Sequence, residues 1–341
     1  MGVDPKVAVI GAGSWGTAFA CITAEKGVDT TLWARRAELA DEINERHVNS
    51  SYLADFELPP TLTATSDLER ALGGAGVVVM AVPSHAFRDV FREAVPLIDG
   101  DAPVVSLTKG IEQDTRARMT QVMVEEGHLA PWRVACASGP NLAKEVMQRM
   151  PSATVVACSD DATADMLQGV FMAKHFRVYT NDDIIGCELS GAMKNVIAIA
   201  AGIADGMGFG DNSRATLVTR GLAEMARLGA KLGANPLTFA GLAGMGDLVA
   251  TCISPLSRNR HVGEQLGRGH SLEEITGEMH MVAEGVKTSR PINMIAEEAG
   301  VEIPLCEHVA KVVHEGMAPA DIVTALMGRS PKRELQGLDR G

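Results

Sequence analysis

The sequence predicts an α/β fold with two domains, a doubly wound N-terminal domain and an all-helical C-terminal domain. Short, continuously apolar, β-branched segments alternate with helical segments up to residue 181, and such runs are typical of strands buried on both faces of a parallel sheet. After residue 181 the hydrophobic period becomes helical throughout. We therefore expect domains at 1–181 and 182–327, and a polar tail at 328–341.

Eight segments of the first domain are predicted to be strands. They are 6–10, 30–33, 61–65, 77–82, 104–107, 134–137, 153–158 and 176–179. The first helix follows Ser14, places Phe19, Ile22 and Thr23 on one face, and ends where Gly27 can take the left-handed conformation that closes a helix.

The second domain is predicted to contain helices only. They are expected at 188–203, 213–232, 260–266, 271–278, 291–298 and 303–314. Within 213–232, the apolar stripe begins at Val218, and a polar stripe of Arg220, Glu224 and Arg227 is expected on the opposite face.

Composition excludes several classes of function. The chain has 341 residues with 43 Asp and Glu against 31 Lys and Arg, a formal net charge of −12. This charge repels nucleic acids and anionic membranes. The six cysteines are dispersed without metal-ligand spacing, which predicts buried thiols, a reducing compartment and no bound metal. No apolar stretch is expected to reach the ~20 residues of a membrane span, so the protein is predicted to be cytoplasmic.

A glycine-rich motif follows the first predicted strand. Gly11, Gly13 and Gly16 form a G-x-G-x-x-G pattern that also opens a helix, and this context is typical of a Rossmann-type dinucleotide site. Gly11 permits the tight turn, Gly13 lets a pyrophosphate approach the backbone, and Gly16 lets the helix pack on the strand. The free N–H groups of the helix N-terminus then hold the pyrophosphate.

The second predicted strand selects the dinucleotide. It ends in Arg35 and Arg36, while the nearest acids, Asp29 and Glu38, lie before the strand and inside the next helix. Two guanidinium groups suit a ribose 2′-phosphate, so NADP(H) is preferred over NAD(H). The alternative is a solvated arginine pair at the start of a helix.

Two lysines are candidates for chemistry. Lys194, followed by Asn195, stands at the head of an otherwise apolar helix, and a desolvated lysine can exchange a proton near neutral pH. The alternative is a lysine that extends to solvent. Lys109 follows a predicted strand at the carboxyl edge of the sheet, where ligands of such sheets bind, and the loop containing Gly139 and Asn141 follows the next strand.

The helical domain contains two further polar segments. Gly241–Asp247 is rich in glycine, but no strand precedes it, so it indicates a close backbone approach rather than a second nucleotide site. Ser257, Arg258 and Asn259 precede a helical pattern and offer donors that could hold a phosphate, or simply a helix cap with surface arginines.

Several segments together resemble the NAD(P)-dependent sn-glycerol-3-phosphate dehydrogenases of the bacterial type. The segments that carry the resemblance occur in the family's order, at 11–17, 32–36, 81–84, 108–111, 138–141, 188–196, 241–248, 257–260 and 282–285. One departure is Asn141, where the family often has Ser or Thr; an amide can still donate a hydrogen bond.

The resemblance implies reversible reduction of dihydroxyacetone phosphate to sn-glycerol 3-phosphate for phospholipid synthesis, by a cytoplasmic enzyme that usually forms a homodimer. It implies that Lys194 exchanges the proton, assisted by Lys109 and Asp247. The implied substrate-binding residues are Lys109, Gly139, Asn141, Lys194, Asn195, Asp247, Ser257, Arg258 and Asn259. The residues expected at the cofactor, which include the glycine motif, are Gly11, Gly13, Ser14, Trp15, Gly16, Arg35, Arg36, Lys109, Ala143, Arg258, Val282 and Glu284.

Two other functions fit the same architecture. One is a different dehydrogenase with a Rossmann domain and a helical domain, acting on 3-hydroxyacids or on 6-phosphogluconate; such an enzyme has no need of the segment at 257–259 or of the two lysines. The other is a non-catalytic NADP(H) sensor, which would keep the glycine motif and the arginine pair but would need no lysine at the site.

Overall fold

The computed structural model describes residues 5–279 and 283–330. The described chain divides into two compact units. Unit 1 contains residues 5–108 and 119–184, and unit 2 contains 109–118 and 185–330. Lys109, which the sequence places after a strand of the first domain, is thus grouped with the helical unit. Of the predicted tail, 331–341 lies outside the described residues, whereas Gly328, Arg329 and Ser330 are exposed.

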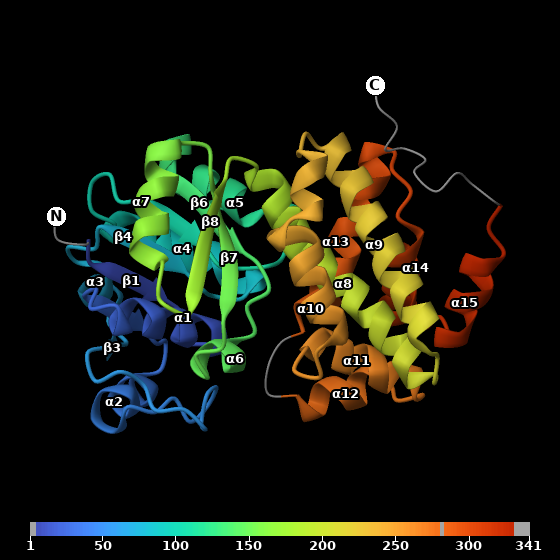
Figure 1. Cartoon of the computed structure of the whole chain (residues 1–341), viewed down its shortest axis with the longest axis horizontal. Coiled ribbons are helices and arrows are strands. Elements are labelled where there is room, and N and C mark those ends of the chain that lie inside the picture. Colours follow the sequence, from blue (N-terminus) through green and yellow to red (C-terminus); the bar gives the residue numbers. More distant parts are fainter. Residues whose placement is uncertain (1–4, 280–282, 331–341) are drawn as a thin grey trace. The chain divides into compact units, whose positions relative to one another are not determined.

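Unit 1 contains the eight predicted strands, whose bounds agree with the expected ranges to within a few residues (Figure 1). They are β1 (Val7–Ile10), β2 (Thr30–Trp33), β3 (Thr63–Thr65), β4 (Val77–Met80), β5 (Val104–Ser106), β6 (Val134–Ser138), β7 (Ser152–Cys158) and β8 (Phe176–Asn181). Their order in the sheet is β3-β2-β1-β4-β5-β6-β7-β8.

Two strands, β7 and β8, run opposite to the other six. β7 runs antiparallel to β6, with Cys136 opposite Ala157, while β8 is parallel to β7. Every other pair in the sheet is parallel. A continuous apolar run indicates burial on both faces but not strand direction, which explains why the sequence did not reveal this reversal.

The helices of unit 1 complete its doubly wound fold. They are α1 (Ser14–Glu25), α2 (Ala37–Arg46), α3 (Leu68–Leu72), α4 (Ser84–Ala94), α5 (Met119–Gly127), α6 (Ala143–Met147) and α7 (Asp161–Phe171), with short 3₁₀ turns η1 (Val95–Leu97) and η2 (Pro131–Arg133). Helix α1 buries Phe19, Ile22 and Thr23, as predicted. Gly27 follows it with a φ of +91°, which confirms the expected helix end.

Unit 2 is helical in the part of the chain that the structure describes. Its elements are α8 (Ile184–Gly206), α9 (Asp211–Lys231), α10 (Asp247–Ile253), α11 (Arg258–Gly267), α12 (Leu272–Glu278), α13 (Glu284–Ala299), α14 (Pro304–Glu315) and α15 (Pro319–Met327), with short turns η3 (Pro236–Ala240) and η4 (Leu242–Gly246). The sequence did not predict α10 or α15, since each is short and only part of its surface is buried.

Helix α8 is the core of unit 2. Its residues from Gly186 to Ala204 are buried in an unbroken run. Contrary to the sequence-based expectation, α8 is long and apolar enough to cross a membrane, but 89% of its most apolar window is buried inside the protein. Such burial is typical of the core helix of a soluble protein.

One predicted surface residue is buried. Glu224 of α9 was expected on a polar stripe, yet only 2% of its surface is exposed. Its carboxylate accepts hydrogen bonds from the backbone N–H groups of Leu305 and Cys306, at 2.7 and 3.2 Å. These are unpaired donors in the first turn of α14, so Glu224 closes the end of that helix. Helical periodicity cannot reveal a partner that lies 81 residues away.

Candidate active site

The glycine motif of unit 1 has the geometry that a dinucleotide site requires. Gly11 has a φ of +120°, and a Cβ on Gly16 would lie 2.0 Å from the Gly11 carbonyl oxygen. A Cβ on Gly13 would meet no atom within 4 Å. Gly11 and Gly16 therefore serve the turn and the close packing of α1, while Gly13 leaves open space in front of the α1 N-terminus. These residues fit a bound pyrophosphate.

The neighbours of the motif are held by the rest of unit 1. Ser14 donates a hydrogen bond to the carbonyl oxygen of Tyr52, at 3.3 Å. The ring of Trp15 packs against Phe19 and Phe176, with centroids 5.7 and 6.2 Å apart. Trp15 thus connects the first turn of α1 to the hydrophobic core.

The arginine pair is exposed after β2. Arg35 and Arg36 are both exposed, and Arg36 donates a hydrogen bond to Ser51 Oγ at 2.8 Å. Asp29 precedes β2 and Glu38 lies in the first turn of α2, in agreement with the prediction. The charged side chains between β2 and α2 are those of Arg35 and Arg36.

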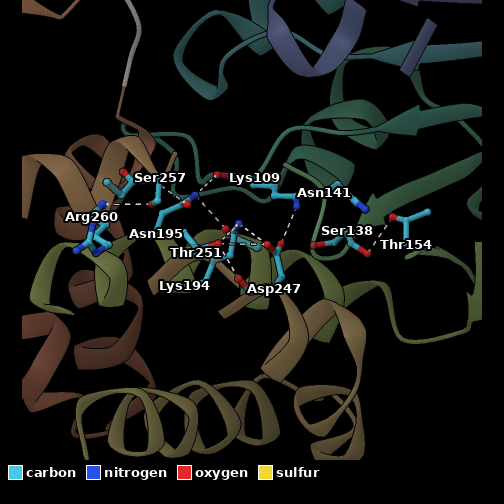
Figure 2. A network of polar contacts seen from close by, with 12 residues as sticks. Lys109, Ser138, Asn141, Thr154, Lys194, Asn195, Asp247, Thr251, Ser257 and Arg260 are labelled. Carbon is cyan, nitrogen blue, oxygen red and sulfur yellow. Dashed lines mark hydrogen bonds and ion pairs between the residues drawn. The ribbon is translucent and has the colours of Figure 1, made fainter. Parts of the chain in front are cut away.

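A charged cluster of three side chains lies in unit 2 (Figure 2). Asp247, the first residue of α10, bridges two lysines: Oδ1 lies 2.6 Å from Lys194 Nζ, and Oδ2 lies 2.6 Å from Lys109 Nζ. The side chains of Lys194 and Asp247 are 8% and 3% exposed, and that of Lys109 is 16% exposed. The lysine of the α8 core therefore does not extend into solvent, which was the alternative interpretation.

Burial and the charges of neighbouring side chains have opposing effects on the pKa values of this cluster. Burial lowers the pKa of Lys194 to about 8, opposed by the attraction of Asp247 and reinforced by the repulsion of Lys109. Burial by itself would raise the pKa of Asp247, but the two ammonium groups hold it below its ordinary value. Lys194 can therefore be protonated or neutral near physiological pH, next to a carboxylate that stays charged.

Thr251, which the sequence analysis did not identify, completes the surroundings of Lys194. Its Oγ1 accepts a hydrogen bond from Lys194 Nζ at 2.8 Å and donates to the Asp247 carbonyl oxygen at 2.6 Å. Thr251 lies four residues after Asp247, one turn along α10, so a prediction of that helix would have identified it. An ammonium group has three donors; Asp247 and Thr251 occupy two of them.

A chain of amide hydrogen bonds extends from this cluster. Asn195 donates to the carbonyl oxygen of Lys109 at 3.1 Å and accepts from Asn259 Nδ2 at 2.9 Å. Asn259 Oδ1 accepts from the backbone N–H of Gly285 at 2.8 Å. The two predicted amides are therefore brought together, and they tie the backbone of Lys109 to the first turn of α13.

The glycine-rich segment before Asp247 has the predicted role. A Cβ on Gly244 would lie 2.2 to 2.5 Å from backbone atoms of Phe239. This close approach folds 242–246 into a π-helical turn that runs directly into α10. Turns of this kind are frequent at functional sites.

The segment 257–260 opens α11. Ser257 is the N-cap, and its Oγ accepts from the backbone N–H of Arg260 at 3.2 Å. Arg258 is the first residue of the helix, so a guanidinium group and a positive helix end occur together. Arg260 pairs with Asp205 at 2.8 Å.

The other predicted site residues lie in the loop after β6, in α6 and at the start of α13. Asn141 Nδ2 donates to the Ala153 carbonyl oxygen at 2.8 Å, next to Gly139, and Ala143 begins α6. A Cβ on Gly139 would lie 3.0 Å from that same carbonyl oxygen, so this loop of unit 1 is closely packed. Glu284 begins α13. Val282 lies outside the described residues.

Two further observations concern the state of the cysteines and the presence of possible metal ligands. All six cysteines are buried free thiols, as predicted. In the described ranges, no group of three or more His, Cys, Asp or Glu side chains is arranged to hold a metal ion.

The chain matches two family models that together span most of its length. Residues 6–164 match the N-terminal model of NAD-dependent glycerol-3-phosphate dehydrogenase, and residues 183–324 match the C-terminal model. The chain belongs to this family. The resemblance stated from the sequence motifs is therefore confirmed.

Individual relatives agree with the family models. The glycerol-3-phosphate dehydrogenase [NAD(P)+] of Parafrankia sp. is 52% identical over 96% of this chain and 98% of the relative. That of Corynebacterium jeikeium is also 52% identical, over 96% of this chain and 99% of the relative. The glycerol-3-phosphate dehydrogenase structure from Coxiella burnetii is 38% identical and covers 96% of this chain and 100% of that chain, with a TM-score of 0.91.

These similarities establish the general class of the family member. It is an NAD(P)-dependent oxidoreductase with a Rossmann-like domain and a helical C-terminal domain, as the sequence predicted.

Proposed function

We propose that this family member interconverts dihydroxyacetone phosphate and sn-glycerol 3-phosphate, with NADP(H) preferred over NAD(H) and with Lys194 as the proton carrier. The observation that carries the proposal is the buried Lys194 ammonium, whose pKa is lowered to about 8 while Asp247 and Thr251 fix its position. A general acid works best when its pKa lies near the working pH.

Reduction of a ketone needs a hydride at carbon and a proton at oxygen. The bound nicotinamide supplies the hydride. As the new C–H bond forms, the carbonyl oxygen gains negative charge, and Lys194 Nζ gives it a proton, so that an O–H bond forms and the lysine is left as a neutral amine. In the reverse direction the neutral amine takes the hydroxyl proton.

The other two members of the cluster have supporting roles in this proposal. The ammonium group of Lys109 stabilises the negative charge that develops on the substrate oxygen. Asp247 is a positioning residue: it holds both lysines and offsets the repulsion between them. Asn195 keeps the Lys109 backbone in place through its hydrogen bond to the carbonyl oxygen.

The substrate phosphate is assigned to the start of α11. Arg258 offers a bidentate, charge-assisted contact, and the Ser257 hydroxyl and the helix N-terminus add donors. Binding of the phosphate, a part of the substrate that does not react, helps to position the carbonyl group. We assign supporting substrate contacts to Gly139, Asn141, Asn195 and Asn259.

The cofactor is assigned to the glycine motif and its surroundings. The open space at Gly13 fits the pyrophosphate, and Arg35 with Arg36 suits a 2′-phosphate. We assign further cofactor contacts to Ser14, Trp15, Lys109, Ala143, Arg258, Val282 and Glu284. We also propose that the enzyme is a cytoplasmic homodimer that supplies glycerol 3-phosphate for phospholipid synthesis.

One assay tests the proposed reaction against its rivals. In the forward direction the protein is mixed with NADPH and dihydroxyacetone phosphate, and the loss of NADPH absorbance is measured. In the reverse direction it is mixed with NADP and one of three substrates, which are sn-glycerol 3-phosphate, a 3-hydroxyacid and 6-phosphogluconate. We expect turnover only with dihydroxyacetone phosphate and its product. Turnover with the other substrates would indicate a different dehydrogenase, and NADPH binding without any turnover would indicate a sensor.

A substitution tests the phosphate site. Arg258→Ala should raise the KM for dihydroxyacetone phosphate about tenfold or more, because it removes a charge-assisted contact to the phosphate. Arg268→Ala, an exposed arginine of unit 2 outside the site, is the matched control. An unchanged KM would place the phosphate elsewhere.

A further inference from the structure

Unit 2 contains a cavity of about 1000 Å³ that none of the proposed site residues lines. It is bounded by the end of α8, by α9, by the segment 300–305 that enters α14, and by α15. Its volume lies at the upper end of the range for pockets that bind small molecules. The proposed oxidoreductase reaction therefore does not account for this cavity.

Two walls of the cavity are apolar. Helix α8 contributes Ile203 and Ala204, whereas α15 contributes Ile322, Val323 and Leu326. Ile203 and Ile322 are buried, but Val323 is 36% exposed. A long apolar ligand would remove such surface from water and gain about 25 cal/mol for each Å² that it buries.

The third wall carries positive charge. Arg220, Arg227 and Lys231 occur at spacings of seven and four residues on α9, so they follow one another along one stripe of the helix. Among the described residues, Arg220 and Lys231 have no ion-pair partner within 4 Å. The pKa of Arg227 is lowered by its partial burial, against the attraction of Glu224, and further by the repulsion of Arg220.

The two acids at the cavity are already engaged. Glu224 accepts two backbone N–H groups at the start of α14, and burial raises its pKa to about 7. Glu302 pairs with Arg329 at 2.6 Å. Among the described residues that line the cavity, the charges that remain are the three cations of α9, on a chain whose net charge is −12.

We propose that this cavity binds a single-chain amphiphilic anion. The alkyl chain would lie between the apolar walls of α8 and α15, and the headgroup, a carboxylate or a phosphate monoester, would be held by Arg220 and Arg227. Charge complementarity selects the anion, and the apolar walls select the chain. The site is separate from the proposed reaction, so its test does not depend on turnover.

Calorimetric titration of the full chain tests the proposal. The probes are dodecanoate and dodecyl phosphate, which share a chain and differ in headgroup, each kept below its micelle concentration. We expect saturable binding of at least one probe, and the tighter of the two identifies the headgroup. Dodecyltrimethylammonium, with the same chain and a positive headgroup, should bind at least tenfold more weakly. Equal binding of the cationic probe would overturn the proposal.

Two variants locate the binding. Arg220→Ala should weaken binding of the anion about tenfold or more, with Arg268→Ala as the control. Val323→Glu, which puts a carboxylate on the α15 wall, should also weaken it, while Val124→Glu, at a similarly exposed valine of unit 1, should not. Thermal unfolding with the same midpoint as the parent shows that each variant is folded. Unchanged affinity in both cavity variants would overturn the proposal.

A second copy of the chain is the alternative occupant of the cavity. Light scattering measures the molar mass of the parent and of Val323→Glu, with and without dodecyl phosphate. We expect the same mass in all four samples. A lower mass caused by the variant or by the probe would show that the groove is a subunit interface and would overturn the proposal.

Discussion

The glycine motif of unit 1 is built from six consecutive residues, Gly11 to Gly16, whereas the charged cluster of unit 2 joins residues that are far apart in the chain. Asp247 lies 53 positions from Lys194 and 138 from Lys109. The motif acts through backbone geometry, which local sequence dictates. The cluster acts through charges whose pKa values depend on one another and on burial, so the loss of one member changes the others.

We therefore expect a single substitution in the charged cluster to cost more stability than one in the glycine motif. The largest effect is expected from Asp247→Ala, because it removes the buried carboxylate that contacts both ammonium groups. Removing one partner of a buried ion pair costs about 3–5 kcal/mol. Equilibrium urea unfolding measures the loss, with the exposed Asp211→Ala as control. A loss below about 1 kcal/mol would show that the cluster does not act as a unit.

Lys194→Ala should lower kcat for ketone reduction by about 10²-fold or more and leave the Kd of NADPH unchanged, because the lysine supplies the proton and is not among the residues assigned to the cofactor. In the parent, kcat/KM for reduction should fall as pH rises through about 8, since the ammonium loses its proton, while the oxidation direction gains. Normal turnover in the variant would remove Lys194 from the chemistry.

A double variant at the arginine pair tests the cofactor preference assigned to the end of β2. Arg35→Ala with Arg36→Ala should raise the KM of NADPH about tenfold and leave that of NADH unchanged, because only NADPH has the 2′-phosphate. Steady-state kinetics with each cofactor measures the ratio. Equal changes for both cofactors would contradict the assigned preference and indicate a solvated pair.

The smallest effect is expected from Thr251→Val, which removes one acceptor of the Lys194 ammonium and leaves Asp247 in place. Loss of that hydrogen bond disfavours the charged form, so the pKa of Lys194 should fall and kcat at neutral pH should drop about threefold. The pH profile of reduction should shift to lower pH. Thr251→Ser, which keeps the hydroxyl, should restore the parent profile; failure to do so would mean that the threonine only fills space.

Much of the fold was predictable from the sequence because its signals are local. All eight strands, the end of α1 at Gly27 and most of the long helices were expected, since apolar runs and glycine positions reflect interactions within a few residues. The reversal of β7 and β8 and the helices α10 and α15 were not, because strand direction and short helices depend on what lies opposite them.

For the site, the sequence determined which chemical groups the chain has: a glycine turn, an arginine pair and two lysines in unusual places. The contacts between distant residues became visible in the folded chain: Asp247 bridges both lysines, Thr251 joins them, and Glu224 is buried against the start of α14. The physical reason is that desolvation and charge coupling act through space over a few ångströms, while sequence periodicity reports only which face of an element is buried.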